Sequence, residues 1–249
     1  MPLVTSQEIL RAAYEGHWAV GAFNANNMEQ IQGIVDAAVE ERAPVILQVS
    51  QGAIRYAGLE FAAAMVRTAA TEADVPVVLH LDHGTDFDQN VRCMRAGFTS
   101  LMFDGSALPL EENVAITSRV TEIAHIVGVP VEAELGKVLK STDNVTEEDV
   151  LNAMTKPEEA REFVERTKCD SLAIAVGSVH AMRSQAAELN IERVKAIRQM
   201  VDIPFVLHGS SGVREESALE AIPYGVAKIN VATLLNQAFT TGIKRGLAE

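Results

Sequence analysis

Short runs of β-branched and other apolar residues alternate along the chain with longer segments in which apolar residues recur three and four positions apart. The short runs are typical of strands that are buried on both faces, and the longer segments are typical of helices that pack by one face. Strands are predicted over residues 19–24, 44–50, 76–82, 100–105, 129–136, 171–177, 204–210 and 227–233. Helices are predicted over residues 28–42, 56–73, 88–97, 110–128, 156–168, 191–201 and 215–225.

This alternation predicts an α/β fold with a parallel sheet, and eight parallel strands can close into a (β/α)8 TIM barrel. The chain has 249 residues, close to the roughly 250 that such a barrel needs. An open doubly wound sheet would carry a Gly-rich turn after the first strand, where this chain has Asn24-Ala-Asn-Asn. No linker or change of composition marks a second domain, so residues 1–249 are predicted to form a single barrel domain.

The charged residues of the chain limit the classes of partner that it is expected to bind. The chain carries 21 Lys and Arg residues against 34 Asp and Glu residues, a net charge of -13. This negative charge repels nucleic-acid phosphates and anionic lipid headgroups, so neither nucleic acid nor a membrane is expected as a partner. An anionic metabolite would need a local positive site, such as a metal ion or a helix N-terminus.

The cysteines and the N-terminal sequence indicate the cellular compartment of the protein. Cys93 and Cys169 are the two cysteines, and they form no CxxC pair, which favours a reducing environment. The first ten residues, MPLVTSQEIL, show neither the charged nor the apolar region of a signal peptide. A cytoplasmic location is therefore expected.

Three of the six histidines, His83, His180 and His208, lie just past the third, sixth and seventh predicted strands. In a barrel the carboxyl ends of the strands meet at one mouth, where the chemistry is found. The carboxylates of Asp104 and Glu134 end two further strands at the same mouth. Three neutral imidazoles leave a divalent cation an open coordination position, the arrangement of catalytic zinc sites. The pattern predicts a Zn²⁺ site; the alternative is a polar rim of three hydrogen-bonded imidazoles.

Asp82 directly precedes His83 in the motif HLDHG. A carboxylate beside the predicted metal is well placed to move a proton on a bound substrate, and its alternative role is to orient a metal ligand. His80 lies two residues earlier on the same strand face, one layer deeper, and is assigned to support of the core.

Small and hydroxyl residues follow the seventh and eighth predicted strands, in the segments HGSSG (208–212) and AKINVAT (227–233). Barrels commonly bind phosphate at this place, through backbone N–H groups and hydroxyls. Small residues let the backbone approach an anion closely. The candidate phosphate-binding residues of the two segments are Gly209, Ser210, Ser211, Asn230, Ala232 and Thr233.

Six motifs in this order, HLDHG, FDGS, EAELG, VGSVH, VLHGSSG and KINVAT, together resemble the class II, metal-dependent ketose-bisphosphate aldolases, the family of fructose- and tagatose-bisphosphate aldolases. The likeness spans nearly the whole chain. It implies that His83, His180 and His208 are the zinc ligands and that Asp82 is the acid/base that handles the C4 hydroxyl. Glu134 and Asp104 match carboxylates near the metal, one of which can serve an alternative ion position, so a second divalent or monovalent cation stays open. Gly209, Ser211, Asn230 and Thr233 match positions that hold the ketose phosphate.

The resemblance implies a reversible carbon–carbon lyase that cleaves a phosphorylated ketose into dihydroxyacetone phosphate and an aldehyde. The expected partners are the small-molecule sugar phosphate and further copies of the chain, in a dimer or a tetramer. Two other functions remain as alternatives. One is a catalytically weak barrel that keeps the metal and binds a sugar phosphate, and the other is a metal-assisted sugar-phosphate isomerase or epimerase. A Schiff-base aldolase is not expected, because Lys228 is placed at the entrance of the eighth strand, away from the mouth.

The sequence departs from the family pattern at three places. Ala181, followed by Met182 and Arg183, stands where the family usually has Gly and then Tyr-Lys; alanine keeps its N–H, so Ala181 stays a phosphate-binding candidate. The irregular stretch 137–149, a candidate active-site loop, lacks the family's Gly-Gly pair. Its acidic residues 147–149 could supply a second base only if the loop folds over the site. Ala232 stands where many members carry Asp or Asn.

Overall fold

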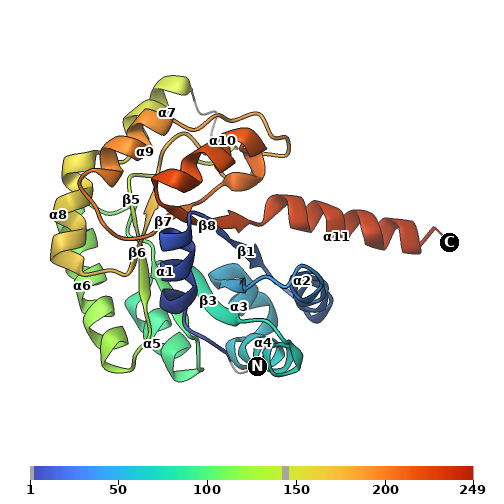
Figure 1. Cartoon of the computed structure of the whole chain (residues 1–249). Coiled ribbons are helices and arrows are strands. Elements are labelled where there is room, and N and C mark those ends of the chain that lie inside the picture. The colour runs from blue at the N-terminus through green and yellow to red at the C-terminus, as the bar shows by residue number, and fades with distance from the viewer. Residues whose placement is uncertain (1–2, 142–145, 249) are drawn as a thin grey trace.

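The computed structural model describes residues 3–141 and 146–248. Eight parallel strands pair in sequence order, and the eighth pairs with the first, so the sheet closes into the predicted barrel (Figure 1). The strands are β1 (Val20–Asn24), β2 (Val45–Ser50), β3 (Val77–Gly84), β4 (Ser100–Phe103), β5 (Val131–Leu135), β6 (Ser171–Ile174), β7 (Phe205–Leu207) and β8 (Val226–Val231).

Helices follow most strands and cover the outside of the barrel. They are α2 (Met28–Glu40), α3 (Gln51–Ala57), α4 (Leu59–Glu72), α5 (Phe87–Arg95), α6 (Leu110–Ile126), α8 (Pro157–Thr167), α9 (Ile191–Arg198) and α10 (Glu215–Ala221). The single helix predicted over 56–73 is wrong, because α3 and α4 are separate helices. Gly58, at φ 87°, lies between them in a backbone conformation that glycine adopts at little cost.

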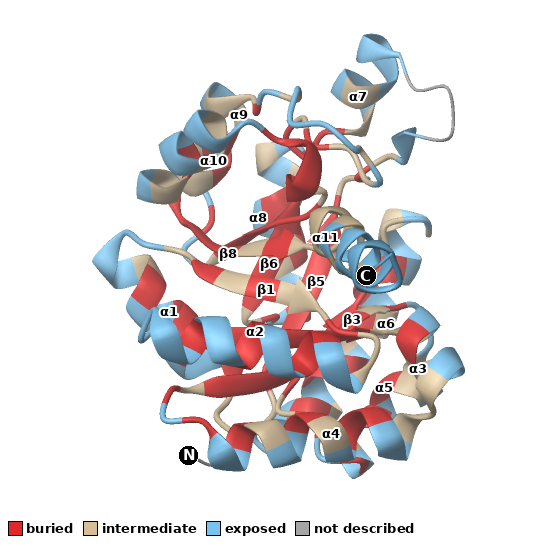
Figure 2. Ribbon diagram, turned by 90° about the vertical axis from the view of Figure 1, so that its right-hand side faces the viewer, coloured by how far each residue is buried: buried red, intermediate tan, exposed pale blue. Residues whose placement is uncertain are grey.

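The core is a layer between the strands and the helices around them, where buried residues run along every strand (Figure 2). A further helix, α1 (Ser6–Gly16), packs Ile9, Leu10 and Ala13 onto residues of β1, β2, β3 and β8. These strand residues, Val20 and Val78 among them, lie at the amino ends of their strands. The amino end of the barrel is thus closed by apolar packing, and the carboxyl end is left to carry polar side chains.

Two helices lie where the sequence pattern predicted none. Helix α7 (Glu147–Ala153) begins inside the stretch predicted to be irregular. Helix α11 (Thr233–Gly246) follows β8 but projects away from the barrel (Figure 1), and it has no buried residue. An apolar cavity of about 470 Å³ lies beside its first turns, lined by residues of β1, α2 and α11 that include Phe23, Ile34 and Phe239.

None of the helices in the described part of the chain is both long enough and apolar enough to span a bilayer.

Candidate active site at the carboxyl end of the barrel

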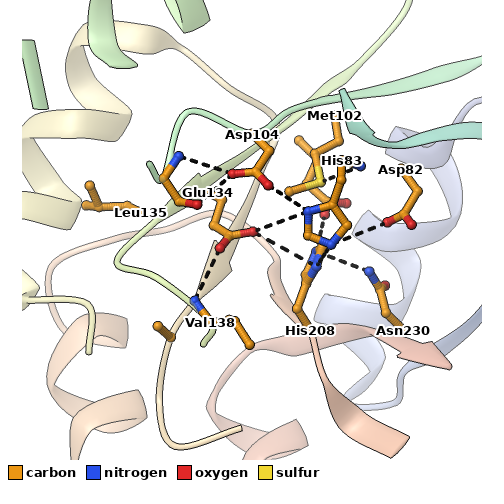
Figure 3. A network of polar contacts seen from close by, with 12 residues as sticks. Asp82, His83, Met102, Asp104, Glu134, Leu135, Val138, His208 and Asn230 are labelled. Atoms are coloured by element: carbon orange, nitrogen blue, oxygen red, sulfur yellow. Dashed lines mark hydrogen bonds and ion pairs between the residues drawn. The ribbon is translucent and has the colours of Figure 1, made fainter. Parts of the chain in front are cut away.

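Strand β3 ends in an irregularity that brings two neighbouring side chains into one space. Consecutive residues of a regular strand point to opposite faces, so Asp82 and His83 could not both face the barrel axis from an ideal strand. The register with β4 shifts between Leu81 and Gly84, and His83 has a left-handed φ of 50°. Asp82 Oδ1 consequently lies 4.0 Å from His83 Nε2 (Figure 3).

The ring of His83 is oriented by a carboxylate from the next strand. Its Nδ1 lies 2.7 Å from Asp104 Oδ2, and the other oxygen of Asp104 accepts hydrogen bonds from the hydroxyl and amide of Ser106. An ionised carboxylate can only accept, so in the neutral ring Nδ1 carries the proton. The lone pair is then on Nε2, which points toward His208.

His208, directly after β7, is held in the same way with its two nitrogens exchanged. Its Nε2 lies 2.9 Å from Glu132 Oε1 and 3.1 Å from Asn230 Nδ2. The shorter contact is to a carboxylate, which when ionised can only accept, so this nitrogen donates to Glu132 and Nδ1 keeps the lone pair. His208 Nδ1 lies 3.0 Å from His83 Nε2. When both rings are neutral, the two carboxylates therefore turn the unprotonated nitrogens of His83 and His208 toward each other.

His180 lies in the loop after β6, and its backbone is held by the loop after β5. Its N–H donates to the Leu139 carbonyl (2.8 Å), and its carbonyl accepts from the amide of Ser141 (3.0 Å). The His180 ring centroid lies 5.2 Å from that of His83 and 5.9 Å from that of His208. The first part of the stretch predicted as an active-site loop thus supports one of the three predicted ligands.

Gly209 allows the loop after β7 to lie against the loop that carries His180. It has a left-handed φ of 66°, and a Cβ added there would lie 2.9 Å from the carbonyl carbon of Val179. A larger residue would push the two loops apart, so glycine is required for this approach of His208 to His180.

The three imidazoles fit a single divalent cation. One nitrogen from each of His83, His180 and His208 lies within 4.8 Å of the others. Two nitrogens that bind one tetrahedral zinc lie about 3.3 Å apart, close to the 3.0 Å between His83 Nε2 and His208 Nδ1. Two buried carboxylate oxygens near the rings have no hydrogen-bond partner among the described residues: Asp82 Oδ1, 4.0 Å from His83 Nε2, and Glu134 Oε2, 4.0 Å from Nδ1 of both His83 and His208. Such atoms are costly unless a ligand satisfies them.

Charge at the site is unevenly divided among the histidines. Burial lowers the pKa of His83, but Asp82, Asp104 and Glu134 outweigh it and raise the pKa to about 10. Burial lowers the pKa of His180 to about 3, with the help of the other two histidines. Burial and the charge of Asp104 raise the pKa of Glu134 to about 6. Carboxylates thus concentrate negative charge around His83, which favours a cation there.

Asp82 is held by a short chain of amides. Its Oδ2 accepts a hydrogen bond from Asn24 Nδ2 (2.7 Å), and Asn24 Oδ1 accepts one from Gln48 Nε2 (3.0 Å). Burial raises the pKa of Asp82. Electrostatic interactions with His83, His208 and Lys228, together with the hydrogen bond from Asn24, lower it by more, so the pKa lies below its ordinary value. Asp82 is thus an ionised base with one oxygen fixed and the other turned to the site.

A cavity of about 110 Å³ opens at this end of the barrel. It brings together most of the predicted residues: it is lined by Asn24, Asp82, His83, His180, Ala181, His208, Gly209, Ser211, Asn230, Ala232 and Thr233. Asp104 and Glu134 are not among the lining residues, and both contact His83 Nδ1. Ser210 is not among the lining residues, because its hydroxyl donates to the carbonyl of Asn230.

Ala181, one of the cavity residues, has a left-handed φ of 62°. Alanine pays a steric cost there that glycine does not. We therefore expect Ala181→Gly to raise the free energy of unfolding by about 0.5–1 kcal/mol, measured by urea denaturation of the metal-free protein. Ala186→Gly, at an exposed position nearby with a negative φ, is the matched control and should not stabilise. A destabilised A181G variant would contradict the expectation.

Sequence reasoning missed part of the site. Gln48 and Glu132 received no role, and neither did Lys228, which is not among the residues that line the cavity; its Nζ contacts Glu132, which in turn contacts His208. The period of two along a strand is the signal that could have found Lys228, since it shares a face with Asn230. Residues 147–149 do not reach the described cavity; they are exposed and begin α7, where Asp149 caps the helix with Thr146. Residues 142–145 of that stretch lie outside the described residues.

Comparison with known proteins gives consistent matches over the whole chain. A family model described as "Fructose-bisphosphate aldolase class-II" matches residues 4–249. The chain is 46% identical over 252 residues to a fructose-bisphosphate aldolase of Geobacillus stearothermophilus, covering 100% of this chain and 87% of that protein. It is 39% identical over 249 residues to a sulfofructosephosphate aldolase of Alkalicoccus urumqiensis, with coverage of 100% and 87%. The crystal structure of the YdjI aldolase from Escherichia coli K12 superposes with a TM-score of 0.88 at 37% identity, covering 99% of this chain and 88% of that chain.

Proposed function

The chain belongs to the class II fructose-bisphosphate aldolase family, and on that premise we propose that it reversibly cleaves a phosphorylated ketose into dihydroxyacetone phosphate and an aldehyde. Fructose 1,6-bisphosphate and tagatose 1,6-bisphosphate are the candidate substrates. The observation that carries the proposal is the approach of His83 Nε2 to His208 Nδ1 (3.0 Å), with Asp82 Oδ1 4.0 Å from the same nitrogen of His83. A cation bound by these imidazoles and the base Asp82 could therefore act on the same substrate atom or on neighbouring atoms.

The residues that would hold the cation, which we propose to be Zn²⁺, are His83, His180 and His208. When bound, a divalent cation polarises the ketose carbonyl and stabilises the negative charge that develops during cleavage. Asp104 and Glu134 form a second group with His83 whose ligand atoms lie within 4.8 Å of one another. We propose that this group offers an alternative position for a cation.

In the cleavage direction, Asp82 Oδ1 takes the proton of the C4 hydroxyl as the C3–C4 bond breaks, so that C4 becomes the aldehyde carbonyl. The electron pair of the broken bond passes to the ketose carbonyl as an enediolate, and uptake of a proton at the former C3 completes dihydroxyacetone phosphate. In the reverse reaction that carbon gives up its proton, and Asp82 returns its own to the C4 oxygen. The base is ready because Asp82 is ionised, and Asn24 prevents its carboxylate from rotating away. Burial of Asp82 keeps bulk water from competing for the proton.

The ketose phosphate is proposed to lie against the residues that follow β7 and β8. Thr233 begins the 14-residue helix α11, whose N-terminus faces the cavity through Ala232 and Thr233. Helix N-termini bind phosphate through free N–H groups and the helix dipole. Gly209, Ser211, Asn230 and Ala181 line the same cavity, while Ser210 lies between two lining residues and its hydroxyl donates to the Asn230 carbonyl.

A coupled assay for dihydroxyacetone phosphate tests this function. Release of dihydroxyacetone phosphate from fructose or tagatose 1,6-bisphosphate is expected, with activity lost on treatment with a chelator and restored by zinc. Tight zinc binding without cleavage of any ketose phosphate would favour a catalytically weak binding barrel. Product analysis that finds an isomer instead of two fragments would favour an isomerase or epimerase.

Zinc affinity is expected to rise with pH. At neutral pH the metal-free His83 is protonated, because its pKa is raised to about 10, so binding must displace that proton. His180, with a pKa near 3, is already neutral and adds no such dependence. The association constant should therefore increase at least about tenfold per pH unit between about pH 6 and pH 8, measured by competition with a chelator of known affinity. A constant that does not change over this range would contradict the charge assigned to His83.

Three further properties are proposed with the function. We propose that residues 1–249 form one domain, supported by the pairing of β8 with β1. We propose a homo-oligomer, a dimer or a tetramer, supported by the projecting helix α11 and the apolar cavity beside it; light scattering of the purified protein tests it. We propose a reducing cytoplasmic location, supported by the free, buried thiols of Cys93 and Cys169.

A further inference from the structure

Beneath the site, buried polar side chains form a continuous hydrogen-bonded chain through the middle of the barrel. Lys228 Nζ lies 2.7 Å from Glu132 Oε2 and 3.3 Å from His80 Nε2. His80 Nδ1 lies 2.8 Å from Ser100 Oγ, which lies 2.7 Å from Ser6 Oγ at the start of α1. All five residues are buried, and Lys228 and His80 are fully enclosed. A lysine in this position is costly unless its charge is paired, so its placement calls for a reason.

The upper end of this chain reaches a predicted metal ligand. Glu132 uses its two oxygens separately: Oε1 accepts from His208 Nε2 at 2.9 Å, and Oε2 accepts from Lys228 Nζ at 2.7 Å. The bond from His208 decides which ring nitrogen carries the proton, and hence that Nδ1 faces His83. The direction of the His208 ring therefore depends on where Glu132 is held and on its remaining an acceptor.

Lys228 meets both requirements. Its ammonium is a donor only, so it fixes Oε2 and compensates the charge of a carboxylate that is 2% exposed. The direction of donation continues below it, because His80 Nε2 must accept from Lys228 and His80 Nδ1 then donates to Ser100. Burial and the charge of Lys228 lower the pKa of His80 to about 3, which keeps this ring neutral and able to accept.

We propose that Lys228 is a positioning residue of the metal site, which acts through Glu132 to fix the tautomer and the direction of the His208 ring. The inference rests on the proposed role of His208 as a metal ligand. It assigns to the buried lysine of β8 a role that needs no contact with the cation or with substrate.

The test is the zinc dissociation constant of Lys228→Met, measured by competition with a chelator, together with the visible absorption spectrum of the Co²⁺-substituted protein. Methionine keeps an unbranched side chain of similar length and removes the charge. Zinc binding should weaken by about 10- to 100-fold, and the Co²⁺ bands should shift because one ligand is misdirected. If the K228M protein has the zinc affinity and the Co²⁺ spectrum of the wild type, the proposal is overturned. Failure of the wild-type protein itself to bind zinc would instead overturn the proposed function.

Two further variants separate positioning from general stability. Ser100→Ala cuts the same buried chain at its lower end, so it should lower the melting temperature of the metal-free protein and leave zinc affinity within about twofold. Equal weakening of zinc binding by S100A and K228M would overturn the proposal, because it would make the effect one of core integrity.

The double variant Lys228→Met/Glu132→Gln leaves no unpaired charge in the core, so it keeps the test available if K228M alone does not fold. If Lys228 acts through Glu132, removal of the lysine has little left to change once Glu132 is replaced. The zinc affinity of the double variant should then equal that of E132Q within about twofold. If the losses of zinc affinity caused by the two substitutions add independently in the double variant, Lys228 does not act through Glu132 and the proposal is contradicted.

Discussion

Replacement of Asp82 by alanine is expected to lower the turnover number for ketose bisphosphate cleavage by about 10²- to 10⁴-fold, the usual contribution of a positioned general acid/base. Asp82 is the buried carboxylate with one oxygen held by Asn24 and the other free toward the site. It is not one of the three imidazoles that would bind the cation, so the zinc content of the purified variant should equal that of the wild type. Turnover is measured with the coupled assay and zinc by elemental analysis.

Asp82→Asn is the matched control. The amide oxygen can still accept the hydrogen bond from Asn24, so the side chain keeps its place while losing the ability to take a proton. Both variants should lose turnover to a similar extent, with little change in KM. If a variant at position 82 loses its zinc along with its activity, Asp82 supports the metal site structurally and is not the acid/base.

The second large effect is expected for His208→Ala. Loss of this ring removes one of three proposed ligands and leaves Glu132 without its partner at Oε1. Zinc should dissociate during dialysis, and turnover should fall by at least about 10³-fold, because polarisation of the carbonyl contributes several kcal/mol to the transition state. Zinc content and activity are measured on the same preparation.

His125→Ala controls for the loss of a histidine elsewhere. His125 lies at the end of α6, partly exposed and hydrogen-bonded to Asp170. This variant should keep its zinc and its activity. Unchanged zinc occupancy in H208A would show that the ligand set is wrong, and equal loss in H125A would show that the effect is one of stability.

Much of the fold could be predicted from the sequence, because strands buried on both faces leave uninterrupted apolar runs, and all eight such runs are strands of the barrel. The errors lie where the local pattern of apolar residues does not determine where a helix begins or ends. Gly58 divides a helix whose apolar spacing continues across the break. Helix α11 was not predicted; it has no buried residue, and its apolar Leu235 and Phe239 are only partly buried.

The candidate site could be predicted as a set of residues, because the positions of His83, His180 and His208 after their strands place them at one mouth. Their orientation could not. It depends on the bulge at the end of β3, on the close approach at Gly209, and on the stagger of the closed barrel that brings Lys228 beside Glu132. These are properties of strand pairing between residues distant in the sequence, and no short motif encodes them.

Closure of the barrel by β8 also has a consequence for synthesis of the chain. A nascent polypeptide that has left the ribosome as far as the loop after β7 already contains all three histidines, yet it lacks Lys228, Asn230 and the first turn of α11. One wall of the cavity and the inner support of Glu132 are therefore translated last. A cation taken up by the growing chain would meet only part of its pocket, so metal loading in the finished geometry has to await release of the C-terminal segment.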